Sequence, residues 1–234
     1  MKHLQAKDYV ACGISLFFLL LLCVNLDGFI AATKAAPYCA SFLKFAVLAT
    51  FGECIGLRIT TGDYNRPGFG ILPKALVWGL LGVGIKMAFT IFAVGAPAVL
   101  AELGLPAGAA ALKSGDFFPR LSAAFFVSVT INSIFAPLFM TLHKVADLHI
   151  AETGGTIRGF LAPIPMGRLL KEIRWDVMWG FVFKKTLPCF WVPAHTITFM
   201  LPQHFQVVFA ALLGVVLGVI LAVAGAQKSA AGAA

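Results

Sequence analysis

The stretch Val207–Val223, VVFAALLGVVLGVILAV, decides the fold of this chain, because it is apolar on every face of a helix. Leu16–Cys23, LFFLLLLC, has the same character near the other end of the 234 residues. A membrane-spanning helix needs roughly 20 mostly apolar residues, whereas a barrel strand alternates in polarity over about ten. Hydrophobic residues make up 60% of the chain and charged residues 12%, which leaves little for a solvated surface. The sequence therefore predicts an all-α polytopic membrane protein.

Hydropathy along the chain predicts about six spans in one integral membrane domain covering residues 1–234. The predicted spans are Tyr9–Leu26, Tyr38–Ile59, Leu72–Ala101, Leu121–Leu142, Val177–Leu201 and Phe205–Ala226. The first span has a second interpretation as a secretory signal, because Lys2 and Lys7 precede the apolar run and small residues follow at Ala31–Ala36. Removal of that segment leaves the orientation of the other five spans unchanged.

The lysines and arginines of the connections predict the orientation, because basic residues concentrate on the inner side of a membrane. With both chain ends inside, eleven basic residues fall in inner segments and three in outer ones. The inner residues are Lys2, Lys7, Arg58, Arg66, Lys74, Lys144, Arg158, Arg168, Lys171, Arg174 and Lys228, and the outer ones are Lys34, Lys113 and Arg120. This bias accounts for the pI near 9.4, so we expect lipid rather than nucleic acid as partner. The start lacks an Arg-rich, acid-free presequence, which makes a bacterial inner membrane the expected location.

The connection 143–176 is the longest polar segment and is expected on the inner face. It contains turn-forming residues followed by a predicted amphipathic helix at 166–177. At 100° per residue the apolar side chains fall within one arc and the charged ones opposite. The apolar residues are Met166, Leu169, Leu170, Ile173 and Val177, and the charged ones are Arg168, Lys171, Glu172 and Arg174. Such a helix is typical of the membrane interface; the alternative is a gate or a partner-docking element.

The last span carries a repeat of small residues every four positions, centred on Gly214–Gly218, GVVLG. The repeat includes Ala210, Gly214, Gly218 and Ala222. It predicts a smooth helix face that a neighbouring backbone approaches closely. The neighbour is either another helix of this chain, with Gly79, Gly82 and Gly84 as candidates, or a second copy in a homo-oligomer.

The fifth span concentrates polar and aromatic side chains in an otherwise apolar segment. At 100° per residue Lys184, Trp191, His195 and Thr198 lie close to one line. Pro188 and Pro193 interrupt the same helix and free backbone carbonyls that need other partners. This combination predicts a solute pathway. The alternative is a Pro-kinked structural helix whose Lys184 extends to the inner face.

Three further polar residues fall within predicted spans and join the predicted pathway. Glu53 and Lys86 lie near the middle of neighbouring spans, so a buried ion pair between them is expected. Asn132 precedes Pro137 by five residues, which predicts a discontinuity in the fourth span. The embedded lysines outnumber Glu53 and favour an anionic solute. They are Lys44, Lys86, Lys184 and Lys185.

Enzyme motifs are absent from the sequence: it contains no HExxH, no GxSxG and no P-loop. The five cysteines show no CxxC, and no histidine pair has the spacing of a metal or haem ligand set. We therefore expect no catalytic residue, no metal site and no cofactor.

The run Trp191–Gln206, WVPAHTITFMLPQHFQ, resembles the C-terminal signature of the Mpv-type peroxisomal and mitochondrial membrane proteins. Trp191, His195, Thr198 and Phe199 fall where the family has tryptophan, glutamine, asparagine and phenylalanine, and Gln206 falls at its arginine. Pro193 and Pro202 are each displaced by one position. The resemblance covers about the last sixty residues. It implies a pore or metabolite channel and a fold with four spans.

The sequence thus predicts a membrane channel or carrier for a small polar solute, with a preference for anions. Its expected pathway residues are Lys184, Trp191, His195, Thr198, Asn132, Glu53 and Lys86. The competing interpretation is a structural or assembly protein that binds a partner or lipid through the glycine-rich span and the amphipathic helix.

Overall fold

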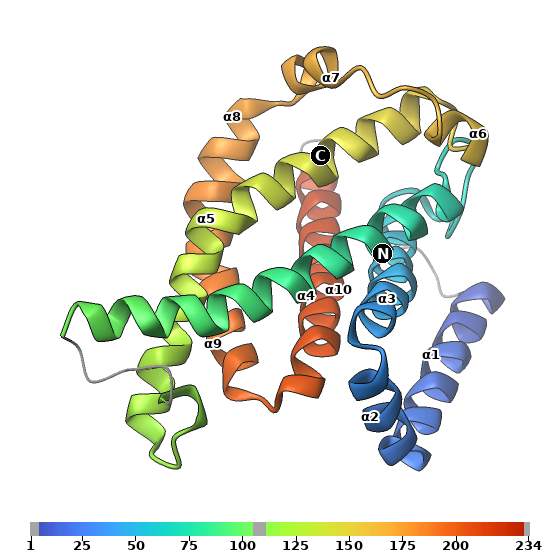
Figure 1. Cartoon of the computed structure of the whole chain (residues 1–234). Coiled ribbons are helices and arrows are strands. Elements are labelled where there is room, and N and C mark those ends of the chain that lie inside the picture. The colour runs from blue at the N-terminus through green and yellow to red at the C-terminus, as the bar shows by residue number, and fades with distance from the viewer. Residues whose placement is uncertain (1–4, 105–110, 232–234) are drawn as a thin grey trace.

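A computed structural model describes residues 5–104 and 111–231, apart from the side chains at 14–15, 17–19, 21–23, 226 and 228–231. These residues form helices and their connections, and no strand occurs among them (Figure 1). The helices are α1 Ala6–Val24, α2 Leu26–Ala35, α3 Pro37–Thr61, α4 Ile71–Glu102, η1 Ala111–Lys113, α5 Phe117–Glu152, α6 Ile157–Phe160, α7 Met166–Glu172, α8 Trp175–Val177, η2 Met178–Trp191, α9 Val192–Met200 and α10 Gln203–Ala231.

Four helices in the described part of the chain are long and apolar enough to cross a membrane, namely α3, α4, α5 and the Gln203–Gly225 part of α10. Large apolar side chains are exposed along them, among them Leu43, Leu80, Ile134 and Val216. Exposed aliphatic side chains on long helices suit a hydrocarbon environment. The helical membrane class predicted from hydropathy is therefore confirmed. The other two predicted spans correspond to α1 and to η2 together with α9, which are not among these four.

Glycine and proline set the ends of the central helices. Pro37 begins α3, and Gly62, with φ of 97°, ends it by donating its N–H to the Arg58 carbonyl. Gly70, with φ of 75°, precedes α4. The discontinuity expected near Pro137 does not occur, because α5 continues through this proline to Glu152. The predicted connection 143–176 accordingly begins ten residues later than expected, and His143 lies inside a helix.

Close helix contacts involve glycines other than those of the last span. A Cβ added to Gly79 of α4 would lie 2.5 Å from the Phe42 ring of α3. A Cβ added to Gly82 would lie 2.6 Å from Phe45 Cβ of the same helix, α3. Gly52 of α3 similarly lies against Val215 of α10. Gly79 and Gly82 therefore pack against α3 rather than against the last span, because the short connection 62–70 pairs α3 with α4.

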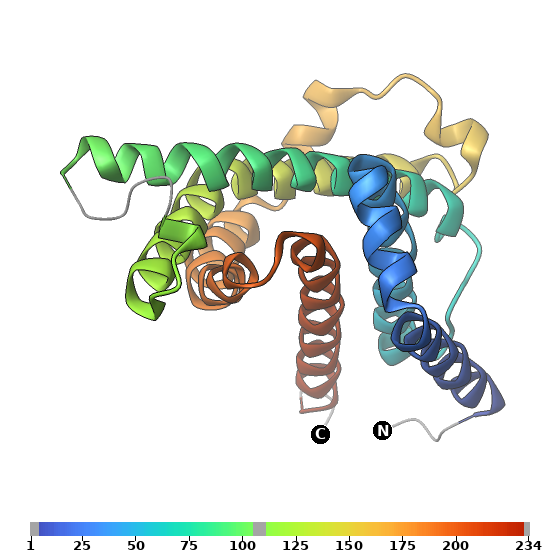
Figure 2. The ribbon, with the colours of Figure 1, turned by 60° about the horizontal axis from the view of Figure 1, so that its bottom comes forward.

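Helix α10 packs mainly against α3 and touches α4 only weakly. Figure 2 shows α10 beginning close to α4 and then diverging from it. On the other side α5 packs against α9 and η2. Two groups of helices, α3 with α4 and α10, and α5 with η2 and α9, are therefore present, and they are joined where α4 packs against α5.

The amphipathic helix expected at 166–177 is shorter in the structure, because the extended backbone of Ile173 separates α7 from α8. Leu169 and Ile173 are buried in a cluster with Val145 of α5 and Met178 of η2. Arg168 pairs with Glu152 at the end of α5 at 2.6 Å. The apolar side of α7 thus covers the protein's own helices, and its exposed apolar contribution is limited to residues such as Met166.

Candidate functional site

A cavity of about 540 Å³ lies between the two helix groups. Six elements line it, namely α3, α4, α5, η2, α9 and α10. Its wall is mostly apolar and aromatic, and includes Phe45, Phe89, Ile131, Phe139 and Leu217. Polar side chains line it in two places, which we call the ion cluster and the central polar group. Glu53, His143 and Asp147 of the lining form the ion cluster together with Lys74, which is outside the lining. Asn132, Trp191 and His195 form the central polar group.

The ion cluster joins three helices through one lysine. Lys74 Nζ lies 2.5 Å from Glu53 Oε2 and 2.6 Å from Asp147 Oδ1. Trp78 Nε1 donates to Glu53 Oε1 at 2.6 Å, and His143 Nε2 lies 3.4 Å from the same oxygen. The side chain of Lys74 is only 11% exposed. Two carboxylates therefore share one largely buried ammonium group.

Helix geometry explains how these side chains meet. Residues four apart lie on one helix face, which holds for Lys74 with Trp78 on α4 and for His143 with Asp147 on α5. Glu53 lies eight residues before the end of α3, and Asp147 lies five residues before the end of α5. Lys74 lies three residues after the start of α4. The cluster thus lies within about two to three turns of one end of all three helices.

The ion cluster also has the composition of a cation site. Glu53 and Asp147 each offer a carboxylate oxygen and His143 an imidazole nitrogen, and these three atoms lie within 4.8 Å of one another. This grouping was not expected, because Glu53 precedes His143 by ninety residues and only the folded chain brings it beside the His143–Asp147 pair. Lys74 Nζ already contacts both carboxylates, so the lysine supplies the positive charge that a metal would otherwise bring.

The central polar group lies on the facing surfaces of α5, η2 and α9. Asn132 Nδ2 lies 3.1 Å from His195 Nδ1 and donates to the Ser128 carbonyl at 2.8 Å. The His195 ring packs against Trp191, with ring centroids 5.0 Å apart, and edge-on against Phe89 at 5.6 Å. Asn132 precedes His143 by eleven residues, which is about 16 Å along α5. The two polar regions are therefore well separated.

Two atoms of the central polar group are buried without a hydrogen-bond partner among the described residues, Asn132 Oδ1 and Trp191 Nε1. Asn132 is 3% exposed and Trp191 9% exposed. One atom is an acceptor and the other a donor. A buried polar atom without a partner costs about 1–3 kcal/mol, so native structures rarely retain one unless another molecule satisfies it.

The predicted line through Lys184, Trp191, His195 and Thr198 is not present, because Met178–Trp191 forms a π-helix. Pro188 lies within it and would clash with the Lys184 carbonyl in a regular α-helix. A π-helix bonds to the fifth preceding residue, so each residue advances by less than 100°. Lys184 is consequently exposed over the Trp179 ring, at 5.8 Å, while Trp191 and His195 line the cavity. Thr198 is buried and donates to the Ala194 carbonyl.

The expected Glu53–Lys86 pair does not form. Lys86 Nζ donates to Thr90 Oγ1 at 2.8 Å, one turn along its own helix. Lys74, three turns earlier on α4, occupies the place beside Glu53. The other embedded lysines are likewise directed elsewhere: Lys44 contacts Thr33 and the Phe29 ring. No lysine belongs to the described lining of the cavity, so the electrostatic basis for an anionic solute is absent there.

The small residues of α10 face the cavity. Ala210, Gly214, Gly218 and Ala222 all belong to its lining. A Cβ added to Gly214 or Gly218 would meet no atom within 4 Å. These glycines therefore provide open space rather than a close helix contact.

Of the pathway residues predicted from the sequence, Glu53, Asn132, Trp191 and His195 line the cavity, whereas the other three members of the ion cluster were not predicted. Lys74 and Asp147 were assigned to connections, and His143 to the edge of a span. Their signal was the four-residue spacing of Lys74 with Trp78 and of His143 with Asp147, together with the length of α5.

Comparison with known proteins gives no match for this chain, either to a protein-family model, to a curated protein or to a solved structure.

Proposed function

We propose that the protein is a channel or carrier for a small solute, which passes through the cavity between the two helix groups. The observation that supports this most is the cavity itself, which connects an ion cluster near one end of three spanning helices with a central polar group. Polar side chains at membrane depth are costly, and are retained where they face a pathway or each other. The resemblance to Mpv-type proteins, through Trp191 and His195, favours the same class of function.

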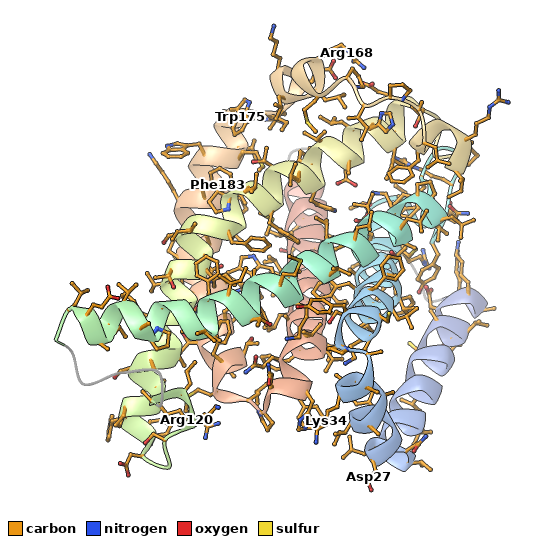
Figure 3. All side chains as sticks on the ribbon, viewed as in Figure 1. Asp27, Lys34, Arg120, Arg168, Trp175 and Phe183 are labelled. Carbon is orange, nitrogen blue, oxygen red and sulfur yellow. The ribbon has the colours of Figure 1, made fainter. Side chains whose placement is uncertain are left out.

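We further propose that η2 and α9 together form a fifth span and α1 another, which gives six spans with both ends on the inner side of a bacterial inner membrane. Met178–Met200 is continuously helical, which supports a crossing at this position. In Figure 3 Arg168 and Trp175 lie at one end of the molecule, and Asp27, Lys34 and Arg120 at the other. Lys2 lies outside the described residues, but Lys7 Nζ lies 2.6 Å from Asp63 Oδ1, so the start of α1 lies beside the connection between α3 and α4.

Thiol labelling tests this orientation. In a variant without the five native cysteines, Lys34→Cys is expected to react with an impermeant maleimide added outside intact cells. Arg168→Cys, whose native side chain is 53% exposed, is expected to react only after permeabilisation. Reaction of both positions from the same side would contradict the proposed topology.

Solute flux into proteoliposomes tests the function, and His195→Leu tests the pathway. The leucine removes the Asn132 contact and the polar ring edge beside Phe89 and Trp191. We expect flux to fall by roughly tenfold, which corresponds to the loss of one buried hydrogen bond, with protein yield unchanged. Lys184→Ala is the control, because Lys184 is exposed outside the cavity lining, and its flux should equal that of the native protein.

Unaltered flux in His195→Leu at equal protein level would remove His195 from the pathway. Absence of flux for cationic, neutral and anionic solutes in a folded protein would contradict the transport proposal as a whole. The assembly interpretation loses support from the glycines of α10, because Gly214 and Gly218 face the cavity and not the outer surface.

A further inference from the structure

We propose that the cavity binds an organic cation with an elongated apolar body, whose ammonium group lies at the ion cluster. The proposal has two claims, that the cavity binds such a cation and that the protein transports it. The second claim rests on the transport function proposed above. The binding part stands on the cavity alone. It replaces the anionic preference suggested by the lysine count.

The charge of the cavity lining favours a cation. Glu53 and Asp147 belong to the lining, whereas Lys74 does not. The two carboxylates of Glu53 and Asp147 outnumber the single ammonium group of Lys74, so the ion cluster does not attract an anion. Asp147 Oδ1 bonds to Lys74, while Asp147 Oδ2 makes no hydrogen bond within the described part of the chain and lies 3.9 Å from His143 Nε2. This second oxygen is placed to accept a charge-assisted hydrogen bond.

The aromatic side chains at the same end strengthen this preference. Trp78 and His143 have ring centroids 4.3 Å apart beside Glu53. Phe69 lies in the lining, and Lys74 Nζ lies over its ring, 5.3 Å from the centroid. Cations lie favourably over aromatic faces, with gains of about 0.5–2 kcal/mol each. Carboxylates combined with aromatic rings therefore recognise an ammonium better than a neutral or anionic group.

The central polar group gives independent evidence of an occupant. Asn132 Oδ1 and Trp191 Nε1 are more than nine-tenths buried and lack partners within the described protein, although both residues line the cavity. Asn132 precedes Asp147 by fifteen residues, which is about 22 Å along α5. Between the two regions the wall includes the side chains of Phe135, Phe139 and Met140. An elongated apolar body fits this wall, and a polar group at its far end would satisfy the two atoms.

Calorimetric titration of the protein in nanodiscs, with empty nanodiscs subtracted, tests the binding. The ligands are 4-phenylbutylammonium, 4-phenylbutan-1-ol and 4-phenylbutanoate, which share one body and differ in charge. We expect the cation to bind at least about tenfold more tightly than the alcohol, and the anion most weakly, as one charge-assisted hydrogen bond implies. Equal affinities, or preference for the anion, would overturn the proposal.

Two variants locate the site. Asp147→Asn should weaken binding of the cation by about 10- to 100-fold and leave binding of the alcohol within about twofold. Asp176→Asn is its control, because Asp176 is exposed and pairs only with Arg174. Gly218→Leu changes no charge and fills the cavity, so it should abolish binding of both ligands. Cation binding that survives Gly218→Leu would place the site elsewhere and overturn the proposal.

The outcomes separate the two proposals. Binding selective for the cation without flux would retain the ligand class and contradict transport. Flux with preference for an anion or a neutral solute would retain transport and overturn the ligand class.

Discussion

Lys74→Met is expected to destabilise the protein by about 3–5 kcal/mol, which is typical when one partner of a buried ion pair is removed. The methionine fills a similar space but leaves Glu53 and Asp147 facing each other without the ammonium group that lies 2.5 and 2.6 Å from them. The three side chains are 11%, 22% and 26% exposed, so water screens the repulsion only in part. Unfolding in a denaturing detergent titration, followed by circular dichroism, measures the change.

Lys86→Met is the matched control for this prediction. It replaces a lysine on the same helix whose only described hydrogen bond is to Thr90, so the change should stay within about 1 kcal/mol. A second control neutralises the whole cluster with Lys74→Met, Glu53→Gln and Asp147→Asn. It should recover most of the lost stability, because no uncompensated charge remains. Equal losses for Lys74→Met and Lys86→Met would show that the ion cluster is not what holds the three helices.

Gly218→Leu is expected to reduce flux by about tenfold or more without loss of stability. The added side chain enters the cavity, where a Cβ meets no atom within 4 Å, and therefore displaces solute rather than protein. Replacing a helical glycine by leucine also favours the helix by somewhat under 1 kcal/mol. Proteoliposome flux and the detergent unfolding midpoint of the same preparation measure the two effects.

The matched control is Gly84→Leu on α4. A Cβ at Gly84 likewise meets nothing within 4 Å, but this glycine does not line the cavity. We expect flux in Gly84→Leu to equal that of the native protein. If Gly218→Leu conducts normally while remaining folded, the solute does not pass along α10.

If the protein transports a solute as proposed, stability and passage are expected to depend on different parts of the molecule. The ion cluster holds α3, α4 and α5 together at one end, whereas the glycines of α10 leave the space open. Asp147 takes part in both proposals, because one carboxylate oxygen binds Lys74 and the other lies at the proposed ammonium site, 3.9 Å from His143. Variants at Lys74 therefore report mainly on folding, and variants at Gly218 report on the pathway.

The sequence by itself determined the membrane class and the positions of α3, α4, α5 and α10, because hydropathy over about 20 residues is a local property. It also identified Glu53, Asn132, Trp191 and His195 as unusual, because a polar side chain in an apolar run is visible without any partner.

Only the tertiary structure decided which polar groups meet. Glu53 pairs with Lys74 rather than Lys86 because the packing of α3 on α4 sets their relative height, and single helices carry no such information. The π-helix around Pro188 turned Lys184 away from His195, since one altered hydrogen-bond register rotates every later residue. Gly214 and Gly218 face a cavity because α10 diverges from α4. Partners and cavities depend on how helices pack, whereas the helices themselves depend on their own residues.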